Sequence, residues 1–205
     1  MVGLPVEQLH AALDEIARRE PAFAVALASA GYPEPRASER GYMTLLRTIV
    51  GQQVSVTSAA ALWTKLGLIV GEPSPANILA ATDEQLRAAG LSRQKASYAR
   101  SLAEEVVSGR LDLDDLAEAD EAAIAQLVAV KGIGRWSAEI YLLFAEGRRD
   151  IWPAGDLAVQ IQIGRILGLP EKPGERALRE LAQGWSPHRG AAAVFAWHQY
   201  NIPVL

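Results

Sequence analysis

The sequence contains no cysteine among its 205 residues and only three histidines, His10, His188 and His198. The absence of cysteine excludes disulfides, thiol nucleophiles, cysteine–zinc sites and iron–sulfur clusters held by cysteine. The three histidines are scattered along the chain and show no spacing typical of metal ligands. The sequence therefore predicts no cofactor.

Long apolar runs are also missing. No stretch of about 18 uninterrupted apolar residues is present, so no membrane span is expected. The first ten residues lack the basic and then apolar pattern of a secretory signal, and we expect a cytoplasmic protein. The formal net charge of −4 argues mildly against nucleic acid as a ligand. Phosphate binding depends, however, on local charge and backbone donors rather than on the total charge.

The pattern of apolar and turn-forming residues predicts an all-α fold with no strand-rich region and no repeat. Thr82, with Gln85 three residues on, matches the capping-box spacing, and Asp120 is expected to cap the helix that follows it. We expect helices over residues 6–28 (interrupted near Pro21), 42–50, 57–66, 93–108, 121–130, 137–144, 157–167, 175–183 and 190–200.

The strongest local pattern lies between the helices expected at 121–130 and 137–144. Gly132 and Gly134 flank Ile133, which permits a tight reversal with positive φ and lets Ile133 tuck between the two helices. The second helix starts at this turn, so its first N–H groups point outward and can bind an anion such as a DNA phosphate. Lys131 and Arg135 add positive charge. An ordinary corner between two helices would also explain the two glycines alone.

The longer segment 127–139 resembles the helix-hairpin-helix of the HhH-GPD superfamily of base-excision DNA glycosylases. In that superfamily a Gly/Pro-rich loop with an aspartate follows the hairpin. Here Pro153-Ala154-Gly155-Asp156 follows, with Asp156 twenty positions beyond Trp136.

Within the superfamily the chain resembles most the AlkA type, 3-methyladenine DNA glycosylase II. Three segments carry this resemblance, which covers about residues 40–200. They are Gly51-Gln52-Gln53-Val54-Ser55, Gly132-Ile133-Gly134-Arg135-Trp136-Ser137-Ala138, and Trp185-Ser186-Pro187-His188-Arg189 with the later Trp197.

The resemblance implies a two-lobed helical fold with the active-site cleft between the lobes. The expected lobes are residues 36–150 and residues 1–35 together with 151–205. Too little sequence precedes Tyr42 for the N-terminal β-rich domain of the longer members, so a short form is expected. The implied partner is double-stranded DNA containing alkylated bases, bound by a monomer.

Asp156 is the implied catalytic residue. It precedes an apolar helix and would also serve as an ordinary N-cap, and the two roles are compatible because a helix N-terminus favours an ionised carboxylate. A fixed carboxylate can stabilise the positive charge that builds on deoxyribose as the base leaves, or it can orient the attacking water.

Trp136 determines the implied subclass. Bifunctional relatives, which also nick the strand, carry at this position a lysine that forms a Schiff base. The tryptophan therefore indicates a monofunctional enzyme that leaves an abasic site. An indole face also binds a cationic alkylated base and stacks on it.

The implied base pocket contains Trp136, Trp197 and Leu157, with Trp152 and Tyr200 as further candidates. Core packing on the helix at 190–200 explains Trp197 equally well. Trp185 and Trp63 are expected in the core.

Other implied roles concern DNA. Gln53 stands where the family inserts a wedge into the gap left by the flipped nucleotide, and Gln52 would brace the site. Arg93 and Lys95 either contact phosphate or belong to a solvated face. The family's hairpins also hold a monovalent cation, Na⁺ or K⁺, and the corresponding backbone carbonyls belong to Val128, Val130 and Ile133.

Three other functions remain open on the sequence. A non-catalytic helix-hairpin-helix DNA-binding module explains the hairpin but not Asp156 or Trp136. A bifunctional glycosylase/lyase for oxidised bases conflicts with Trp136, and an α-helical interaction protein suits the acidic charge. The sequence leaves the lesion open among 3-methyladenine, 7-methylguanine, 1-methyladenine, 3-methylcytosine and ethenoadenine.

Overall fold

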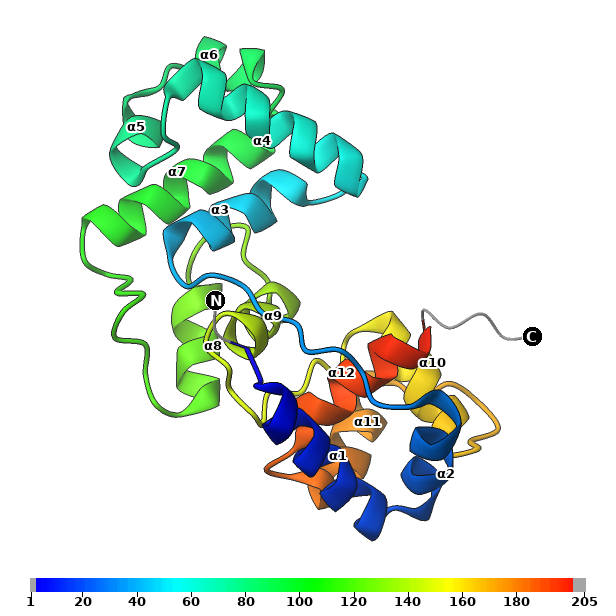
Figure 1. Ribbon diagram of the computed structural model, residues 1–205. Helices are drawn as coiled ribbons and strands as arrows, with labels where there is room; N and C mark the ends of the chain where they lie inside the picture. Colours follow the sequence, from blue (N-terminus) through cyan, green and yellow to red (C-terminus); the bar gives the residue numbers. More distant parts are fainter. Residues whose placement is uncertain (1–2, 201–205) are drawn as a thin grey trace. The chain divides into compact units, whose positions relative to one another are not determined.

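The computed structural model describes residues 3–200, which form twelve α-helices and one 3₁₀ helix (Figure 1). None of these helices is both long enough and apolar enough to pass through a membrane. The elements are α1 Val6–Arg19, α2 Pro21–Ala30, α3 Tyr42–Gly51, α4 Val56–Val70, α5 Pro75–Ala80, α6 Asp83–Ala88, α7 Arg93–Val107, α8 Asp120–Val128, α9 Arg135–Phe144, α10 Leu157–Ile166, α11 Glu175–Leu181, η1 Ala182–Trp185 and α12 Arg189–Tyr200.

The chain divides into two compact units. The first unit combines Met1–Ser38 with Leu142–Leu205, and the second is the continuous stretch Glu39–Tyr141. The boundary between Tyr141 and Leu142 falls inside α9.

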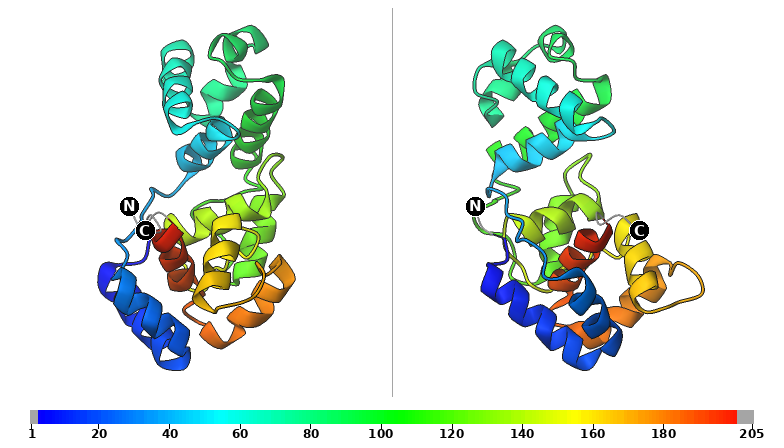
Figure 2. Two further views of the ribbon diagram at one scale, coloured as in Figure 1. Left: turned by 90° about the vertical axis from the view of Figure 1, so that its right-hand side faces the viewer. Right: turned by 45° about the vertical axis from the view of Figure 1, so that its right-hand side comes forward.

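The first unit is built around α12, which is buried along Gly190–Trp197. Helix α1 packs against α2 and α12, and α10 packs against α12 and α2; Figure 2 shows α1 and α2 side by side in dark blue. The buried stripe of α1 is Leu9, Leu13 and Ile16, at the spacing that places them on one helix face. Burying such leucine and isoleucine side chains contributes about 1.5–3 kcal/mol each.

An aromatic cluster completes this core. Phe23 of α2 lies edge-on to Trp185 at 5.0 Å and beside Phe195 at 5.9 Å between ring centres. Trp152 lies edge-on to Trp185 at 5.6 Å. The prediction that Trp185 belongs to the core is confirmed, since its side chain is buried.

The second unit packs α7 against α3, α5 and α6, and α4 against α3 and α6. Leu45, Leu46 and Ile49 of α3 are fully buried, as their helical spacing predicts. Trp63 is not a core residue, contrary to expectation. It is half-buried. The guanidinium of Arg47 lies 4.7 Å from the centre of its ring, a cation–π contact typical of a partly exposed aromatic side chain.

Most of the expected helix boundaries are confirmed, with a few corrections. Thr82 and Gln85 form the complete capping box. Asp120 is not the N-cap, because Ala119 holds the extended N-cap conformation and Asp120 is the first residue of α8. Its carboxylate still suits the positive end of the helix from this position.

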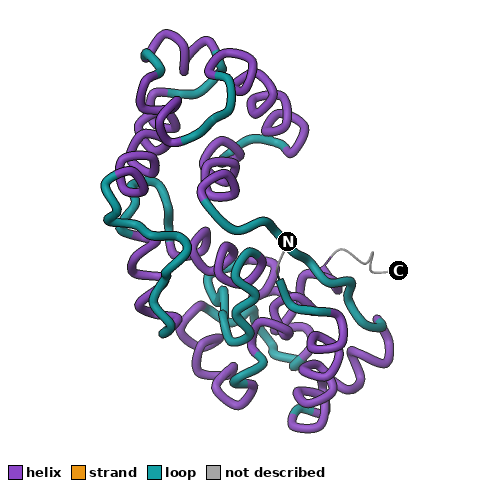
Figure 3. The backbone as a smooth tube through the Cα atoms, turned by 60° about the vertical axis from the view of Figure 1, so that its left-hand side comes forward, coloured by secondary structure: helices purple, strands orange, loops and turns teal. Residues whose placement is uncertain are grey.

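Other elements also differ from the expected ones. Helix α4 runs from Val56 to Val70, so it ends four residues later than expected. Helix α5 was not expected, although Ser74-Pro75 is a standard helix start, with the Ser74 hydroxyl accepting the Asn77 N–H. Helix α9 begins at Arg135, two residues earlier than expected. Among the described residues Figure 3 shows only helix and loop, which confirms the all-α prediction.

Candidate DNA-binding and catalytic site

The turn between α8 and α9 is a tight hairpin in the second unit. Gly132 has φ of +94°, and Ile133 is buried and donates its N–H to the Val130 carbonyl at 3.1 Å. Helix α9 starts directly after Gly134, so the N–H groups of its first turn point out of the helix end. This geometry suits an anion.

The hairpin is attached to α7 by its own backbone and by one side chain. The backbone N–H of Lys131 donates to the Ser101 hydroxyl at 3.2 Å, and its ammonium donates to the Ser97 hydroxyl at 3.2 Å. A Cβ at position 132 would lie 2.2 Å from Cγ of Tyr98. Only glycine therefore allows the hairpin to approach α7 this closely.

The α3–α4 loop is attached to the same hairpin. The side-chain amide of Gln52 donates to the Gly132 carbonyl at 2.8 Å, which is the bracing contact expected of this residue. Gln53 is exposed and has φ of +57°, a left-handed conformation that costs a non-glycine residue about 1–2 kcal/mol. Strain of this kind is often kept where a side chain must be presented to a ligand.

Lys95 also holds this loop. Its ammonium donates to the Val50 carbonyl at the end of α3, at 2.8 Å, and partial burial lowers the pKa of Lys95 below its ordinary value. This contact makes Lys95 a support for the loop, a role that was not predicted from the sequence.

A pocket of about 430 Å³ lies where these parts meet. It is lined by residues of the α3–α4 loop, the start of α7 and the hairpin, namely Gln52, Gln53, Ser92, Gln94, Lys95, Tyr98, Gly132, Ile133 and Gly134. Gln53, the predicted wedge, and the hairpin predicted to bind phosphate thus line one polar pocket.

Arg135 is engaged within the hairpin. Its guanidinium bonds Glu121 of α8 through two nitrogens and Glu139 of α9 through Nε at 2.9 Å. The hydrogen bond to Glu121 raises the pKa of Arg135 above its ordinary value. Its side chain therefore joins the two hairpin helices.

Asp156 in the first unit is the N-cap of α10. Its Oδ1 accepts the backbone N–H of Val159 at 2.9 Å and the indole N–H of Trp197 at 3.1 Å. The carboxylate is half-buried and lies at the positive end of a ten-residue helix. It is thus fixed in position by two donors from different elements.

Of the two roles considered for Trp197, the structure shows core packing. It is 8% exposed and its ring lies 5.6 Å from that of Phe144, as expected for a core residue. Its N–H nevertheless orients the candidate catalytic carboxylate.

A buried side chain of α10 fixes the loop that carries Asp156. Gln160, buried one turn further along α10, donates to the Ala154 carbonyl at 2.8 Å. The oxygen of the same amide accepts the ammonium of Lys172 at 2.6 Å. Both polar ends of a buried glutamine are therefore satisfied, and the loop conformation is fixed.

Asp150, an acid that directly precedes this loop, has a structural partner. Burial would raise its pKa, but its bonds to the Arg189 guanidinium, at 2.7 and 2.8 Å, and to the Ser186 hydroxyl hold that pKa below the ordinary value. Asp150 therefore secures the start of α12.

Residues 46–188 match the model of the HhH-GPD superfamily of base excision DNA repair proteins. The chain belongs to this superfamily. It is 32% identical over 161 residues to DNA-3-methyladenine glycosylase 1 of Schizosaccharomyces pombe, an alignment that covers 76% of this chain and 71% of the relative. It is also 27% identical to a putative DNA-3-methyladenine glycosylase of Bacillus subtilis, of which it spans only 58%.

Solved structures agree with this assignment. A DNA-3-methyladenine glycosidase from Bacillus halodurans superposes with a TM-score of 0.83 at 30% identity, covering 93% of this chain and 89% of that one. The S. pombe 3-methyladenine DNA glycosylase in complex with abasic DNA gives a TM-score of 0.77 at 27% identity, covering 93% and 97%.

The other predicted pocket residues of this HhH-GPD protein are distributed over both units. Trp136 is 48% exposed on the first turn of α9, in the second unit. Leu157, next to Asp156, and Tyr200, at the end of α12, are also exposed. Trp152 is not a pocket residue, because it is buried and its N–H bonds the Leu178 carbonyl at 3.2 Å.

Four further supporting residues of this HhH-GPD fold were not predicted from the sequence. Tyr98 and Ser101 hold the hairpin, and Gln160 and Lys172 hold the loop before Asp156. One signal was available for Gln160. A glutamine set among the apolar residues of a helix indicates a buried polar group, which needs a partner.

Proposed function

We propose that this protein is a monofunctional DNA glycosylase that hydrolyses the N-glycosidic bond of an alkylated base flipped out of duplex DNA. The observation that carries the proposal is the carboxylate of Asp156, held at the N-terminus of α10 by the N–H groups of Val159 and Trp197. The two N–H groups fix the orientation of the carboxylate, as is needed for a charge that acts on the transition state.

The chemistry follows from that charge. As the bond from C1′ to the base breaks, the base takes the bonding electrons and positive charge develops on the deoxyribose. A fixed carboxylate stabilises this charge without having to reorganise. Water then adds to C1′ and releases a proton, leaving an abasic site.

Alkylation of the base explains how one carboxylate, without a general acid, suffices for cleavage of the N-glycosidic bond. A purine alkylated on a ring nitrogen is cationic, so it leaves as a neutral base and needs less help from an acid. The exposed indole of Trp136 suits such a cation through its electron-rich face. The names of the two glycosylase relatives and of the B. halodurans structure support an alkylated purine such as 3-methyladenine as substrate.

The hairpin between α8 and α9 binds the DNA backbone. Backbone N–H groups at the start of α9 bind phosphate regardless of sequence, as an enzyme that scans DNA requires. Gln53, presented from its left-handed conformation, fills the gap left by the flipped nucleotide. The S. pombe relative, whose structure contains abasic DNA, supports the same mode of binding here.

A monovalent cation fits the hairpin. The carbonyls of Val128 and Val130 lie at or just beyond the C-terminus of α8, the negative end of the helix. Together with the Ile133 carbonyl they would hold Na⁺ or K⁺, which would supply positive charge beside a bound phosphate.

Asp156→Asn tests the proposal. Asparagine is as good an N-cap as aspartate, and its oxygen can still accept both N–H groups, so the fold and DNA binding are expected to remain. Excision of 3-methyladenine from alkylated duplex DNA is expected to fall by about 100-fold or more, since a charge aimed at the transition state is lost. Released base is quantified by chromatography.

Asp14→Asn, an acid of α1 in the same unit, is the matched control and should excise normally. Excision by Asp156→Asn at the rate of the parent protein would contradict the catalytic role. Binding without excision by the parent protein itself would favour the non-catalytic DNA-binding module. Profiling the five candidate lesions with the parent protein then defines the substrate range.

A further inference from the structure

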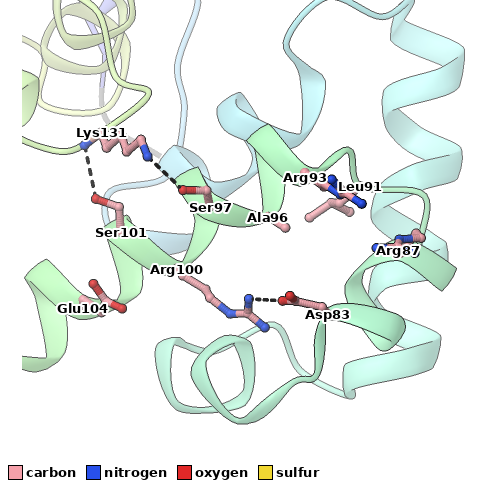
Figure 4. A pocket seen from close by; sticks show the side chains of 10 residues that line it. All are labelled: Asp83, Arg87, Leu91, Arg93, Ala96, Ser97, Arg100, Ser101, Glu104 and Lys131. Atoms are coloured by element: carbon pink, nitrogen blue, oxygen red, sulfur yellow. Dashed lines mark hydrogen bonds and ion pairs between the residues drawn. The ribbon is translucent and has the colours of Figure 1, made fainter.

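A second pocket lies on α7, and it shares no lining residue with the hairpin pocket. Its volume is about 480 Å³, and Figure 4 shows its side chains. Arg93, Ser97, Arg100 and Ser101 line it from one face of α7, at the spacing of successive helical turns. Lys131 reaches it from the hairpin turn and Arg87 from α6.

The pocket has a surplus of positive charge, although the whole protein is acidic. Four cations line it, against the carboxylates of Asp83 and Glu104. Arg100 is neutralised, since it pairs with Asp83 and also donates to the Ala81 carbonyl at 2.7 Å. Within residues 3–200 the ammonium of Lys131 bonds a neutral hydroxyl, that of Ser97, and makes no ion pair.

Arg87 and Arg93 have open hydrogen-bond donors. Like Arg100, whose hydrogen bond has the largest effect, both lie near enough to the Asp83 carboxylate to lower its pKa. Both are exposed, and within residues 3–200 neither side chain makes a hydrogen bond or an ion pair. Figure 4 shows Arg93 beside Leu91, and Arg87 on the side of the pocket that α6 forms. Two guanidinium groups that line one pocket with open donors suit the oxygens of a phosphate backbone.

We propose that this pocket binds the DNA backbone at a second phosphate position, through Arg87 and Arg93. The inference rests on the proposed function. DNA is favoured over a free anion because the pocket borders the hairpin turn: Lys131 of this turn lines it, and the next residue, Gly132, lines the hairpin pocket. A strand held at the hairpin N–H groups therefore has further phosphates close to Lys131.

The decisive measurement is the salt dependence of DNA affinity. The double variant Arg87→Gln/Arg93→Gln is compared with the parent protein on a duplex carrying a stable abasic-site analogue, by fluorescence anisotropy over a range of NaCl concentrations. Each lost phosphate contact lowers the slope of log K against log[NaCl] by about 0.9, so the double variant is expected to show a slope shallower by about 2. Its affinity at low salt should fall several-fold.

Arg18→Gln/Arg176→Gln is the matched control, with the same change in net charge at exposed arginines of the other unit. It is expected to keep the slope of the parent protein. A parent-like slope in Arg87→Gln/Arg93→Gln, or an equal change in the control, would overturn the proposal. Thermal unfolding establishes that both variants are folded.

A titration with inorganic phosphate, followed by calorimetry, separates DNA from a small anion. Phosphate binding that Arg87→Gln/Arg93→Gln abolishes while the DNA slope stays unchanged would assign the pocket to a small anion and overturn the proposal. Failure of the proposed function looks different, because the parent protein would then show no base excision at all.

Discussion

At the scale of single residues, Gly132 and Gly134 are glycines for different reasons. Gly132 has positive φ, and a side chain there would collide with the ring of Tyr98. Gly134 has no such φ, and within residues 3–200 no heavy atom outside Gly134 and its two chain neighbours lies within 4 Å of where its Cβ would be. Its side of the turn is open, as is needed where a backbone must approach a ligand closely.

Alanine variants separate these two reasons. Gly132→Ala is expected to lower the free energy of unfolding by at least about 2 kcal/mol, from the left-handed backbone and the clash with Tyr98. Gly134→Ala is expected to leave that free energy within about 0.5 kcal/mol of the parent value and to weaken DNA binding. Urea unfolding and fluorescence anisotropy measure the two effects, and equal destabilisation by both changes would refute the distinction.

Gln53 stores strain in a position that the proposal assigns to DNA. Gln53→Gly removes the side chain and relieves the left-handed conformation, so stability is expected to stay equal or to rise by up to about 1 kcal/mol. Excision is expected to fall, because nothing fills the gap beside the flipped base. Thermal unfolding and single-turnover excision are measured together; a loss of stability with normal excision would mean that Gln53 is only a loop residue.

At the scale of elements, α10 positions the acid in two ways. Its N-terminus binds the carboxylate of Asp156, and Gln160, one turn along, reaches back to the Ala154 carbonyl. Lys172, twelve positions further on, holds the other end of that amide. The active-site loop is thus shaped by the helix that follows it.

Gln160→Leu tests this support. The buried carbonyl of Ala154 would lose its donor, which is expected to destabilise the protein by about 1–3 kcal/mol. We also expect slower single-turnover excision at saturating protein, with DNA affinity unchanged, because Asp156 would be less well fixed. Gln8→Leu, at an exposed glutamine of α1, is the control, and parent-like excision by Gln160→Leu would limit its role to stability.

The two hairpin helices are also held together by polar side chains. Glu121 of α8 and Glu139 of α9 both bind the guanidinium of Arg135. Glu139 is only 2% exposed, so its charge requires this partner. An arginine that looks like a DNA contact in the sequence is thereby engaged in joining two helices.

At the scale of the whole molecule, the net charge of −4 does not oppose DNA binding. Positive charge that forms no ion pair within residues 3–200 gathers locally, at Lys131, Arg87 and Arg93, and backbone N–H groups add to it at the hairpin. Local potential, not total charge, determines phosphate affinity.

The product of the whole reaction is expected to be an unbroken strand with an abasic site. Position 136 carries tryptophan, so no lysine stands where lyases form a Schiff base. Borohydride added during turnover on alkylated duplex is expected to trap no protein–DNA adduct, and strands should break only after alkali. A trapped adduct, seen by gel electrophoresis, would show lyase activity.

Much of the fold could be predicted because its signals are local. Helix starts such as Thr82, Ser92 and Asp156 are set by a side chain that bonds an N–H three residues away, and apolar spacing identifies the buried faces. Asp120 shows the limit of this logic, since neighbouring residues compete for the cap and the path of the entering chain selects one of them.

The sequence by itself determined the helical architecture, the glycine turn, the aspartate at the start of α10 and the tryptophan in place of a lysine, because these depend on residue identity and short spacing. Only the tertiary structure decided the partners across long separations. Trp197 donates to Asp156 from 41 positions away, and Lys95 supports the α3–α4 loop. The guanidinium of Arg135 binds two glutamates, one from each hairpin helix. Such pairings arise from how helices pack, and packing brings together groups whose distance along the chain carries no information about their contact.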